Sequence, residues 1–452
     1  MHTFAFICLA AAAPNAWALL DARARRRGRE AGKNRRLSDD FSERVKMVAS
    51  DAAADDKFGS SVAIDGDTVV IGAYNAGTGG AVYVYRASDG AELAKLTASD
   101  AAATDNFGRS VAIDGDTVVV GALGDDDGGS SSGSVYVFEK SIWGTYSQVA
   151  KLTAADAAAY DRFGSSVAID GNTIVVGASF DDDAGSASGS VYVFEKSWLG
   201  STYGQVAKLT ASDSSSSDVF GISVAIDGGT IVVGARGHDY YDYGAAYVFR
   251  TTDGWTTHTE FKLTAADAGE DDHFGCSVAI DGNTVVVGAY DDINDAASQW
   301  SSAHVFRTDD GGATYVEVAK LTPEAEYDGF GVSVAISGET VVVGAYRKEA
   351  HRGAAYVYRP SDDGATYSQV AKLVPADAAN IDKVGWSVAI DGGTVVVGAP
   401  EDDDGGSESG SAYVFEDESG WWDYFSSDAA TRALPSAAIL LAAAAVLAAI
   451  LA

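Results

Sequence analysis

The sequence predicts an all-β protein, a seven-bladed β-propeller built from four-stranded antiparallel blades. A sixteen-residue phrase, FGSSVAIDGNTIVVGA at 163–178, recurs in seven similar copies, which begin at Phe58, Phe107, Phe163, Phe220, Phe274, Phe330 and Val384. A period of roughly 50 residues marks a supersecondary unit that stacks on its neighbours and is too small for a domain. Two further β-rich runs follow the phrase, so each repeat supplies four strands, as a propeller blade requires.

The repeat that begins at Phe163 shows where these strands are expected. Residues 166–169 (SVAI) and 173–178 (TIVVGA) form the first two strands, joined by an Asp-Gly-Asn turn. A Gly followed by Asn, Asp, Gly or Glu stands at this turn in every copy, which is typical of a two-residue hairpin. Both runs are almost wholly apolar, which predicts strands covered on both faces. Residues 190–195 (SVYVFE) and 205–211 (QVAKLTA) supply the third and fourth strands.

Strand counting predicts how the ring closes. The last repeat has three strands and no fourth, whereas 45–51 (VKMVASD) aligns with the fourth-strand sequence at 94–100 (AKLTASD). We therefore expect the N-terminal strand to complete the last blade. Each fourth strand also carries a Lys, which suits an outermost strand that must not pair with another chain.

The two ends of the chain are hydrophobic and predict a surface protein. We divide the chain into a signal peptide (1–20), a basic disordered segment (21–43), the propeller (44–416), a juxtamembrane linker (417–433) and a hydrophobic tail (434–452). The Ala-Trp-Ala sequence at 16–18 favours a cleaved signal peptide. The following Lys and Arg residues leave an uncleaved N-terminal anchor as the alternative.

The tail favours a GPI-attachment signal over a retained transmembrane helix, because it is slightly short and ends at the last residue. Either form attaches the protein to a membrane through its C-terminal tail. We expect the chain to pass through the secretory pathway to the cell surface, with the propeller outside the cell.

The repeat pattern is a Phe-Gly pair, about a dozen residues and a Gly-Ala pair, which ends as Gly398-Ala399-Pro400 in the last copy. Over 45–416 this resembles the FG-GAP repeats of integrin alpha-chain propellers and of related algal and bacterial surface proteins. The resemblance implies a seven-bladed propeller used in adhesion or ligand binding. The family's D-x-D-x-D-G calcium loop is reduced here to a short turn such as IDGNT, which cannot supply the six to eight oxygens that Ca²⁺ takes. Any calcium must therefore bind elsewhere.

The formal net charge of −34 argues against nucleic acid as a partner, because phosphate binding needs clustered Lys and Arg. The acidic residues are expected to gather on one face, in the loops before the first strand and between the second and third strands. An Asp two residues before the Phe-Gly position occurs in every blade. It therefore predicts a structural role, a side chain that hydrogen-bonds loop amides, with a ring of metal sites as the alternative.

Features present in only some blades are better functional candidates. Runs of Asp could hold Ca²⁺ in the loops between second and third strands, although such runs are often only solvated loops. The candidate metal ligands are Asp125, Asp127, Asp181, Asp183, Asp402 and Asp404.

Aromatic and basic residues in other loops are candidates for contact with a sugar ring, a protein partner or an anionic group. Packing against a neighbouring blade and local charge balance are the alternatives. The candidate ligand-binding residues are Tyr240, Tyr241, Tyr243, Trp300, Arg347 and Arg352.

The sequence thus predicts a cell-surface propeller that binds a glycan or a protein on its acidic loop face, with Ca²⁺ as a candidate cofactor. A propeller hydrolase that uses paired carboxylates and a structural coat protein without a specific ligand are the alternatives. The six His are scattered, and neither a metal-binding His motif nor a nucleophile elbow occurs, so no catalytic residue is assigned.

Overall fold

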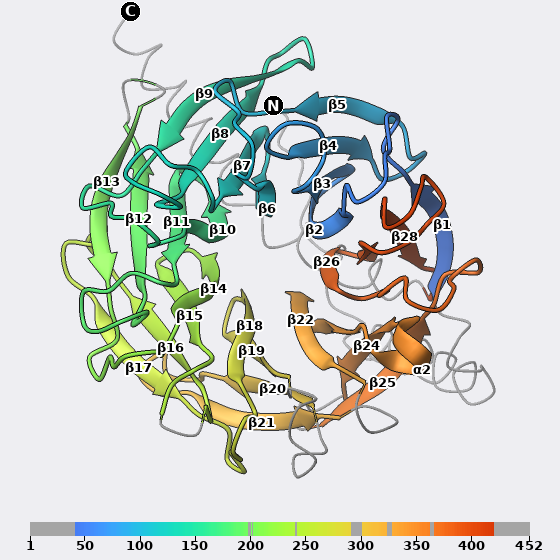
Figure 1. The fold of residues 1–452 in the computed structure, drawn as a ribbon. Helices are drawn as coiled ribbons and strands as arrows, with labels where there is room; N and C mark the ends of the chain where they lie inside the picture. Colours follow the sequence, from blue (N-terminus) through green and yellow to red (C-terminus); the bar gives the residue numbers. More distant parts are fainter. Residues whose placement is uncertain are drawn as a thin grey trace, which may run out of the picture.

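The computed structural model describes residues 41–197, 200, 202–239, 242–290, 301–322, 328–361 and 366–419. Seven four-stranded antiparallel sheets stand around a central axis like the blades of a propeller (Figure 1). This confirms the predicted fold class. In six sheets the four strands follow one another in the sequence, from the innermost strand to the outermost.

We number the blades from the N-terminus and give each from its innermost strand outward. The first three contain β2 (Phe58–Asp65), β3 (Thr68–Ala73), β4 (Ala81–Arg86) and β5 (Glu92–Leu96); β6 (Phe107–Asp114), β7 (Thr117–Ala122), β8 (Ser134–Lys140) and β9 (Tyr146–Leu152); and β10 (Phe163–Asp170), β11 (Thr173–Ala178), β12 (Ser190–Lys196) and β13 (Tyr203–Leu209).

Blades four to six contain β14 (Phe220–Asp227), β15 (Thr230–Ala235), β16 (Ala245–Arg250) and β17 (Thr259–Leu263); β18 (Phe274–Asp281), β19 (Thr284–Ala289), β20 (Ser302–Arg307) and β21 (Val316–Leu321); and β22 (Phe330–Ser337), β23 (Thr340–Ala345), β24 (Ala354–Pro360) and β25 (Tyr367–Leu373). Blade seven contains β26 (Ser387–Asp391), β27 (Thr394–Ala399), β28 (Ser411–Asp417) and β1 (Phe41–Met47).

The predicted closure is confirmed, because the N-terminal strand β1 is the outermost strand of blade seven. Lys46 pairs with Tyr413 of β28, as Lys95 of β5 pairs with Tyr83 of β4. The innermost strands are longer than predicted. In blade three the strand begins at Phe163, and the pairing register with β11 shifts between Phe163 and Ser166.

The hydrophobic core lies between neighbouring blades. One buried cluster joins Val70, Val82 and Val84 of blade one to Phe107 and Val118 of blade two, and similar clusters occupy the other blade boundaries. Because each blade covers its faces with its neighbours, both faces of the middle strands are apolar, as the sequence predicts.

Two rings of hydrogen bonds connect the innermost strands and explain why the phrase S-V-A-I-D-G is repeated. In the first ring, the Ser hydroxyl of each blade donates to the carbonyl of the Phe-Gly glycine in the next blade. The seven bonds, 2.8–3.0 Å long, are Ser61–Gly108, Ser110–Gly164, Ser166–Gly221, Ser223–Gly275, Ser277–Gly331, Ser333–Gly385 and Ser387–Gly59.

In the second ring, the Asp that precedes each hairpin glycine accepts from the amide of the corresponding glycine in the next blade. The seven bonds, 2.5–3.1 Å long, are Asp65–Gly115, Asp114–Gly171, Asp170–Gly228, Asp227–Gly282, Asp281–Gly338, Ser337–Gly392 and Asp391–Gly66. Ser337, which replaces Asp in blade six, accepts the same bond. Sequence reasoning assigned this Asp to the hairpin turn alone, so its contact with the next blade is a finding of the structure.

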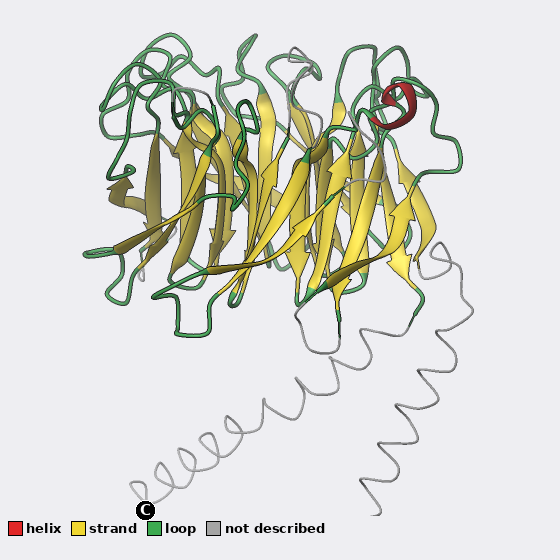
Figure 2. Ribbon diagram, turned by 90° about the horizontal axis from the view of Figure 1, so that it is seen from below, coloured by secondary structure: helices red, strands yellow, loops and turns green. Residues whose placement is uncertain are grey.

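The ring has two different faces (Figure 2). The long-loop face carries the loops between second and third strands, those entering each blade, and the single turn α2 (Lys348–His351). The short-turn face carries the remaining hairpins. Phe41 pairs with Asp417, so both ends of the described chain leave from the short-turn face.

No helix within these described ranges has the length and apolar character needed to cross a bilayer. The predicted signal peptide, nearly all of the basic segment and the hydrophobic tail lie outside the described residues.

Candidate functional site on the long-loop face

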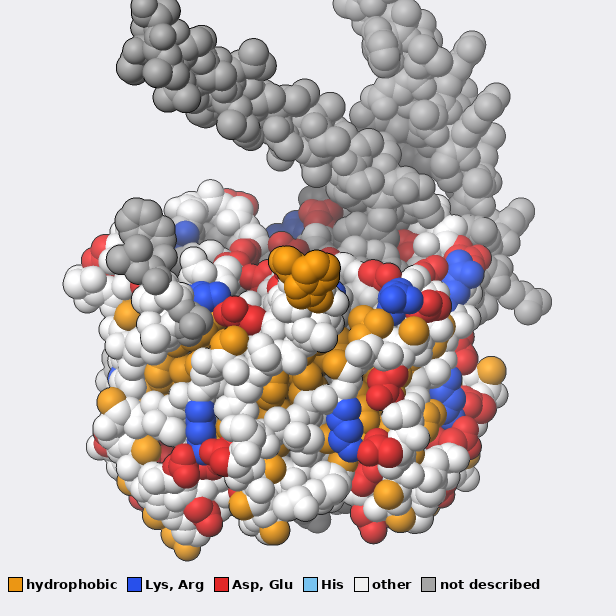
Figure 3. Space-filling model, turned by 90° about the horizontal axis from the view of Figure 1, so that it is seen from above, with side chains coloured by type: hydrophobic (Ala, Val, Ile, Leu, Met, Phe, Trp, Pro, Cys, Tyr) orange, Lys and Arg blue, Asp and Glu red, His pale blue; other side chains and the backbone are white. Residues whose placement is uncertain are grey.

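A Lys from the outermost strand and a Tyr from the third strand meet beneath the loops. In blade two, Lys151 Nζ lies 5.1 Å from the centre of the Tyr136 ring and 2.7 Å from Asp100 Oδ2. Equivalent pairs are Lys46–Tyr413, Lys95–Tyr83, Lys208–Tyr192, Lys262–Tyr247 and Lys372–Tyr356. The sequence suggested that these lysines only protect a strand edge; in the structure their ammonium groups are ion-paired at the loops. Side chains of both charges alternate with apolar ones on the outer side of the ring (Figure 3).

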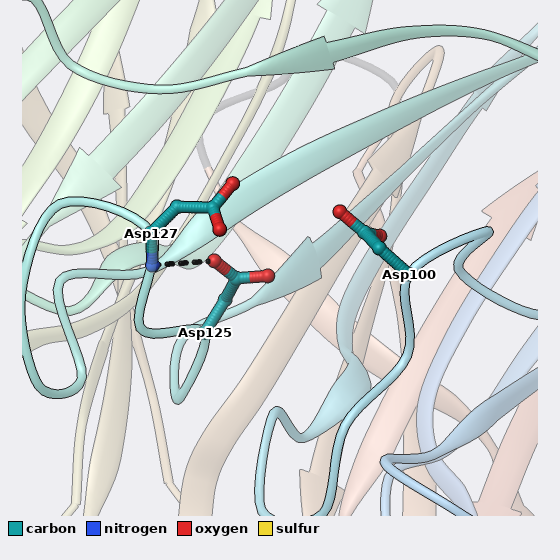
Figure 4. Close-up of side chains that lie close together, drawn as sticks. All are labelled: Asp100, Asp125 and Asp127. Atoms are coloured by element: carbon teal, nitrogen blue, oxygen red, sulfur yellow. Dashed lines mark hydrogen bonds between the residues drawn. The ribbon is translucent and has the colours of Figure 1, made fainter.

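The predicted metal ligands of blade two, Asp125 and Asp127, lie close to Asp100 (Figure 4). Asp100, Asp125 and Asp127 have carboxylate oxygens within 4.8 Å of one another. Lys151 Nζ lies 3.0 Å from Asp125 Oδ2 and 2.5 Å from Asp127 Oδ2. Asp125 is buried and also accepts a hydrogen bond of 2.8 Å from the Tyr136 hydroxyl.

The same grouping occurs in blades three and seven. Lys208 pairs with Asp156, Asp181 and Asp183, and Lys46 pairs with Asp377, Asp402 and Asp404. The structure therefore brings the six predicted ligands together as three pairs. An ammonium group already provides the positive charge at the centre of each.

The ionisation of these groups is coupled. Burial lowers the pKa of Lys151, but its hydrogen bonds to Asp100 and Asp127 raise the pKa more, so the net shift is upward. Burial raises the pKa of Asp125, but the bonds from Lys151 and from the Asp127 amide lower it further. Asp125 and Lys151 are thus both charged around neutral pH, and the lysine is the counterion of the carboxylate.

The Asp that precedes each Phe-Gly pair has the predicted structural role. Its carboxylate accepts a hydrogen bond from the amide three residues earlier, and six such bonds of 2.5–2.8 Å are Asp56–Ala53, Asp105–Ala102, Asp161–Ala158, Asp218–Ser215, Asp272–Gly269 and Asp382–Ala379. Burial raises the pKa of Asp382 to about 6. The bond points backward along the chain, to a loop amide that precedes the Asp.

Among the predicted ligand-binding residues that the structure describes, Arg347 and Arg352 flank α2 in blade six, whereas Tyr243 lies in the loop after β15 in blade four. The Arg347 guanidinium lies 5.2 Å from the centre of the Tyr290 ring and 5.0 Å from that of Tyr346. Arg352 pairs with Glu349 at 3.6 Å. Tyr243 is partly buried beside blade five, where its carbonyl accepts a bond from the Phe274 amide. Tyr240, Tyr241 and Trp300 lie outside the described residues.

A polar pocket opens in blade four, beside Tyr243. It encloses about 1100 Å³, part of it open solvent, and its lining includes Ser215, Ser216, Ser217, Asp213, Asp218, Asp239, Asp242, His238 and Lys262. We call it the blade-four pocket. Its acidic and hydroxyl groups come from the loop that enters the blade and from the loop after β15.

His238 lies in the same loop as the predicted ligand-binding residue Tyr243 and lines this pocket. It occupies the position that Asp125 has in blade two, three residues after the Gly-Ala alanine. Its Nδ1–H faces Asp218 Oδ2 at 3.1 Å, and Lys262 Nζ donates to its Nε2 at 2.6 Å. Alignment of the seven copies shows this exchange of Asp for His.

Comparison with known proteins agrees with the fold. No curated protein matches the chain. Among solved structures, the Saccharomyces cerevisiae protein Sqt1 is similar, with 10% sequence identity and a TM-score of 0.45. The match covers 83% of this chain and 99% of that chain. The model of the FG-GAP repeat matches seven segments, at 41–85, 91–138, 146–194, 203–249, 257–306, 315–358 and 367–415. These matches take in most of the chain, which therefore belongs to the FG-GAP repeat family.

Proposed function

We propose that this chain is an adhesion or ligand-binding propeller that binds a glycan at the blade-four pocket on its long-loop face. The pocket is the observation that carries the proposal. Its lining offers hydroxyl, carboxylate, imidazole and ammonium groups, which can donate to and accept from the hydroxyls of a sugar.

The distribution of differences between blades supports this choice. The hydrogen-bond rings and inter-blade clusters are nearly the same in all blades, whereas the long loops carry Asp runs, His238 or α2 in different blades. A rigid scaffold with variable loops on one face is the usual arrangement of a binding protein.

The direction of the chain ends is compatible with display at a cell surface. Both described ends leave from the short-turn face. A C-terminal tail that attaches the chain to a membrane would leave the long-loop face pointing away from it. Surface attachment, and GPI attachment in particular, are part of the proposal.

Glycan binding is tested with the full-length chain on a panel of glycans and cell-surface proteins. Asp239 is exposed at the pocket, and Asp239→Asn keeps its shape while removing its charge. We expect this variant to bind a glycan several-fold more weakly, whereas Asp116→Asn on the short-turn face should bind like the natural chain. Equal binding by both variants would reject the pocket, and binding of proteins alone would reject the glycan.

A further inference from the structure

A second pocket lies near the central axis, at the long-loop end of the innermost strands. It encloses about 350 Å³, part of it open solvent, and its lining includes Lys57, Tyr74, Arg109, Lys383, Trp386 and Glu401. We call it the axial pocket. It shares no lining residue with the blade-four pocket.

The axial pocket is rich in cations although the chain is strongly acidic. Its lining has three cationic side chains, and Glu401 is its one carboxylate. Glu401 is already engaged by Lys383 at 2.7 Å and by Lys57 at 3.5 Å. Within the described ranges Arg109 has neither a carboxylate partner nor a side-chain hydrogen bond, and its guanidinium lies 5.6 Å from the centre of the Tyr74 ring.

Arg236, which follows β15 in blade four, adds a second guanidinium without a carboxylate partner among the described residues. Burial lowers the pKa of Arg109, and the positive charge of Arg236 lowers it further. A partly buried guanidinium without a counterion costs free energy, and a bound anion would offset that cost. The chain has 65 Asp and Glu residues available, yet none described here neutralises either group.

Aromatic rings hold the neighbouring cations in position. Lys383 Nζ lies 5.4 Å from the centre of the Trp386 ring, and that ring lies edge-on to Tyr346 at 5.0 Å. A guanidinium that rests on a ring keeps its N–H edges available, and those edges match the geometry of an oxyanion. The positive groups are therefore arranged before any ligand arrives.

We propose that the axial pocket binds a tetrahedral oxyanion, a sulfate or phosphate group, through Arg109 with Lys57 and Lys383 beside it. An oxyanion would supply the counterion that Arg109 lacks among the described residues. The site does not depend on the proposed glycan function, because simple inorganic ions are sufficient to test it.

The test titrates the full-length chain with sodium sulfate and with sodium phosphate at constant ionic strength, by calorimetry and by melting temperature. We expect both ions to bind and to raise the melting temperature, whereas chloride should do neither. Arg109→Gln should weaken binding by about tenfold or more. Arg86→Gln is the matched control, because Arg86 is exposed on the short-turn face and pairs with Asp89.

Glucose 6-sulfate and glucose 6-phosphate identify the source of the group. An ester that binds as tightly as the inorganic ion supports an oxyanion carried on a larger molecule, and a weaker ester supports a free ion. The proposal is overturned if sulfate and phosphate act no differently from chloride, or if the folded Arg109→Gln chain binds both ions like the natural chain. The titration of the natural chain needs no variant, so a variant that fails to fold leaves the test intact.

Discussion

At the scale of single residues, a lysine takes the place that a metal ion was expected to fill. Asp125 and Asp127 lie around Lys151 with Asp100, and the same grouping occurs in blades three and seven. A covalently attached cation needs no supply of metal, and its flexible stem lets it follow the loops. The carboxylates that suggested calcium are therefore better described as the partners of a lysine.

Replacing this lysine should show how much the network contributes. Lys151→Met keeps much of the volume but leaves three carboxylates close together, so we expect a loss of about 2 kcal/mol or more in the free energy of unfolding. Lys95→Met is the control, because Lys95 has Asp51 as its one ion-pair partner among the described residues. Denaturant unfolding of both variants measures the difference; equal losses would mean that the additional Asp residues add nothing.

Calcium should act on the variant and not on the natural chain. With Lys151 in place, we expect neither Ca²⁺ nor a chelator to change the melting temperature. In Lys151→Met the oxygens of Asp100, Asp125 and Asp127 face one another without a cation, so added Ca²⁺ should raise the melting temperature. A rise in the natural chain would restore the predicted calcium site.

Because of Asp382, the free energy of unfolding should decrease as the pH rises from about 4 to 6. Burial raises its pKa to about 6 in the folded chain, from 3.8. The folded state then binds more protons than the unfolded state in this window, so stability decreases as the pH increases. Asp382→Asn keeps an acceptor for the Ala379 amide and removes the charge. Relative to the natural chain, we expect the free energy of unfolding of this variant to be about 1–2 kcal/mol more favourable at pH 7 than at pH 4.

Urea unfolding of natural and Asp382→Asn chains at several pH values measures this gain. Asp116→Asn, an exposed change on the short-turn face, controls for the effect of net charge. A difference between natural and Asp382→Asn chains that does not vary with pH would contradict the assignment.

At the scale of the strand, the two glycines of the repeat are a matched pair. A Cβ on Gly121, in the second strand of blade two, would lie 2.1 Å from the carbonyl oxygen of Gly164 in blade three. The same oxygen accepts the hydrogen bond from Ser110. The Phe-Gly and Gly-Ala glycines thus meet across the blade boundary, where only a hydrogen atom fits.

Gly121→Ala should therefore be severely destabilising, by about 3 kcal/mol. Gly204→Ala is the control within another strand, because a Cβ there meets nothing within 4 Å. We expect this control to change stability by no more than about 0.5 kcal/mol. Thermal unfolding of the two variants compares them directly. Similar melting temperatures would show that the neighbouring blades can shift to accommodate a methyl group.

The elements also show what the sequence can and cannot predict. Seven copies of one phrase were enough to predict the blades, the strand order and the role of β1, because periodicity and strand number are properties of the sequence. The contacts of Ser110 and Asp114 with the next blade could not be predicted, because they depend on how neighbouring blades are rotated. For the same reason the sequence placed Asp125 correctly in a loop but could not show Lys151 beside it.

The candidate sites also differ in whether the sequence could reveal them. His238 differs from its counterparts at one aligned position, so the copies alone could reveal it. Lys57, Arg109 and Lys383 come from blades one, two and seven and line one pocket. Such a combination depends on the closed ring and leaves no local pattern in the sequence.

At the scale of the whole molecule, the fold depends on closing a ring with strands from opposite ends of the chain. Ser387 donates to the Gly59 carbonyl at 2.8 Å, and this bond completes the first hydrogen-bond ring. β1 pairs with β28 along its length and buries Phe41 and Met47. Every blade depends on two neighbours, so a loss in blade seven weakens both sides of the closure.

Removal of β1 should therefore destabilise the entire propeller. A chain that begins at Asp51 loses the outermost strand of blade seven, the apolar contacts of Phe41 and Met47, and the pairing of Lys46 with Asp402. We expect a loss of about 5 kcal/mol or more in the free energy of unfolding, because two large buried side chains and a row of strand hydrogen bonds are removed together. A chain that begins at Phe41 keeps β1 and is the matched control.

Addition of a peptide of residues 41–50 should restore part of the lost melting temperature, since the exposed edge of β28 is then paired again. If the chains beginning at Phe41 and Asp51 melt at the same temperature, the ring is held by its innermost strands and not by this closure.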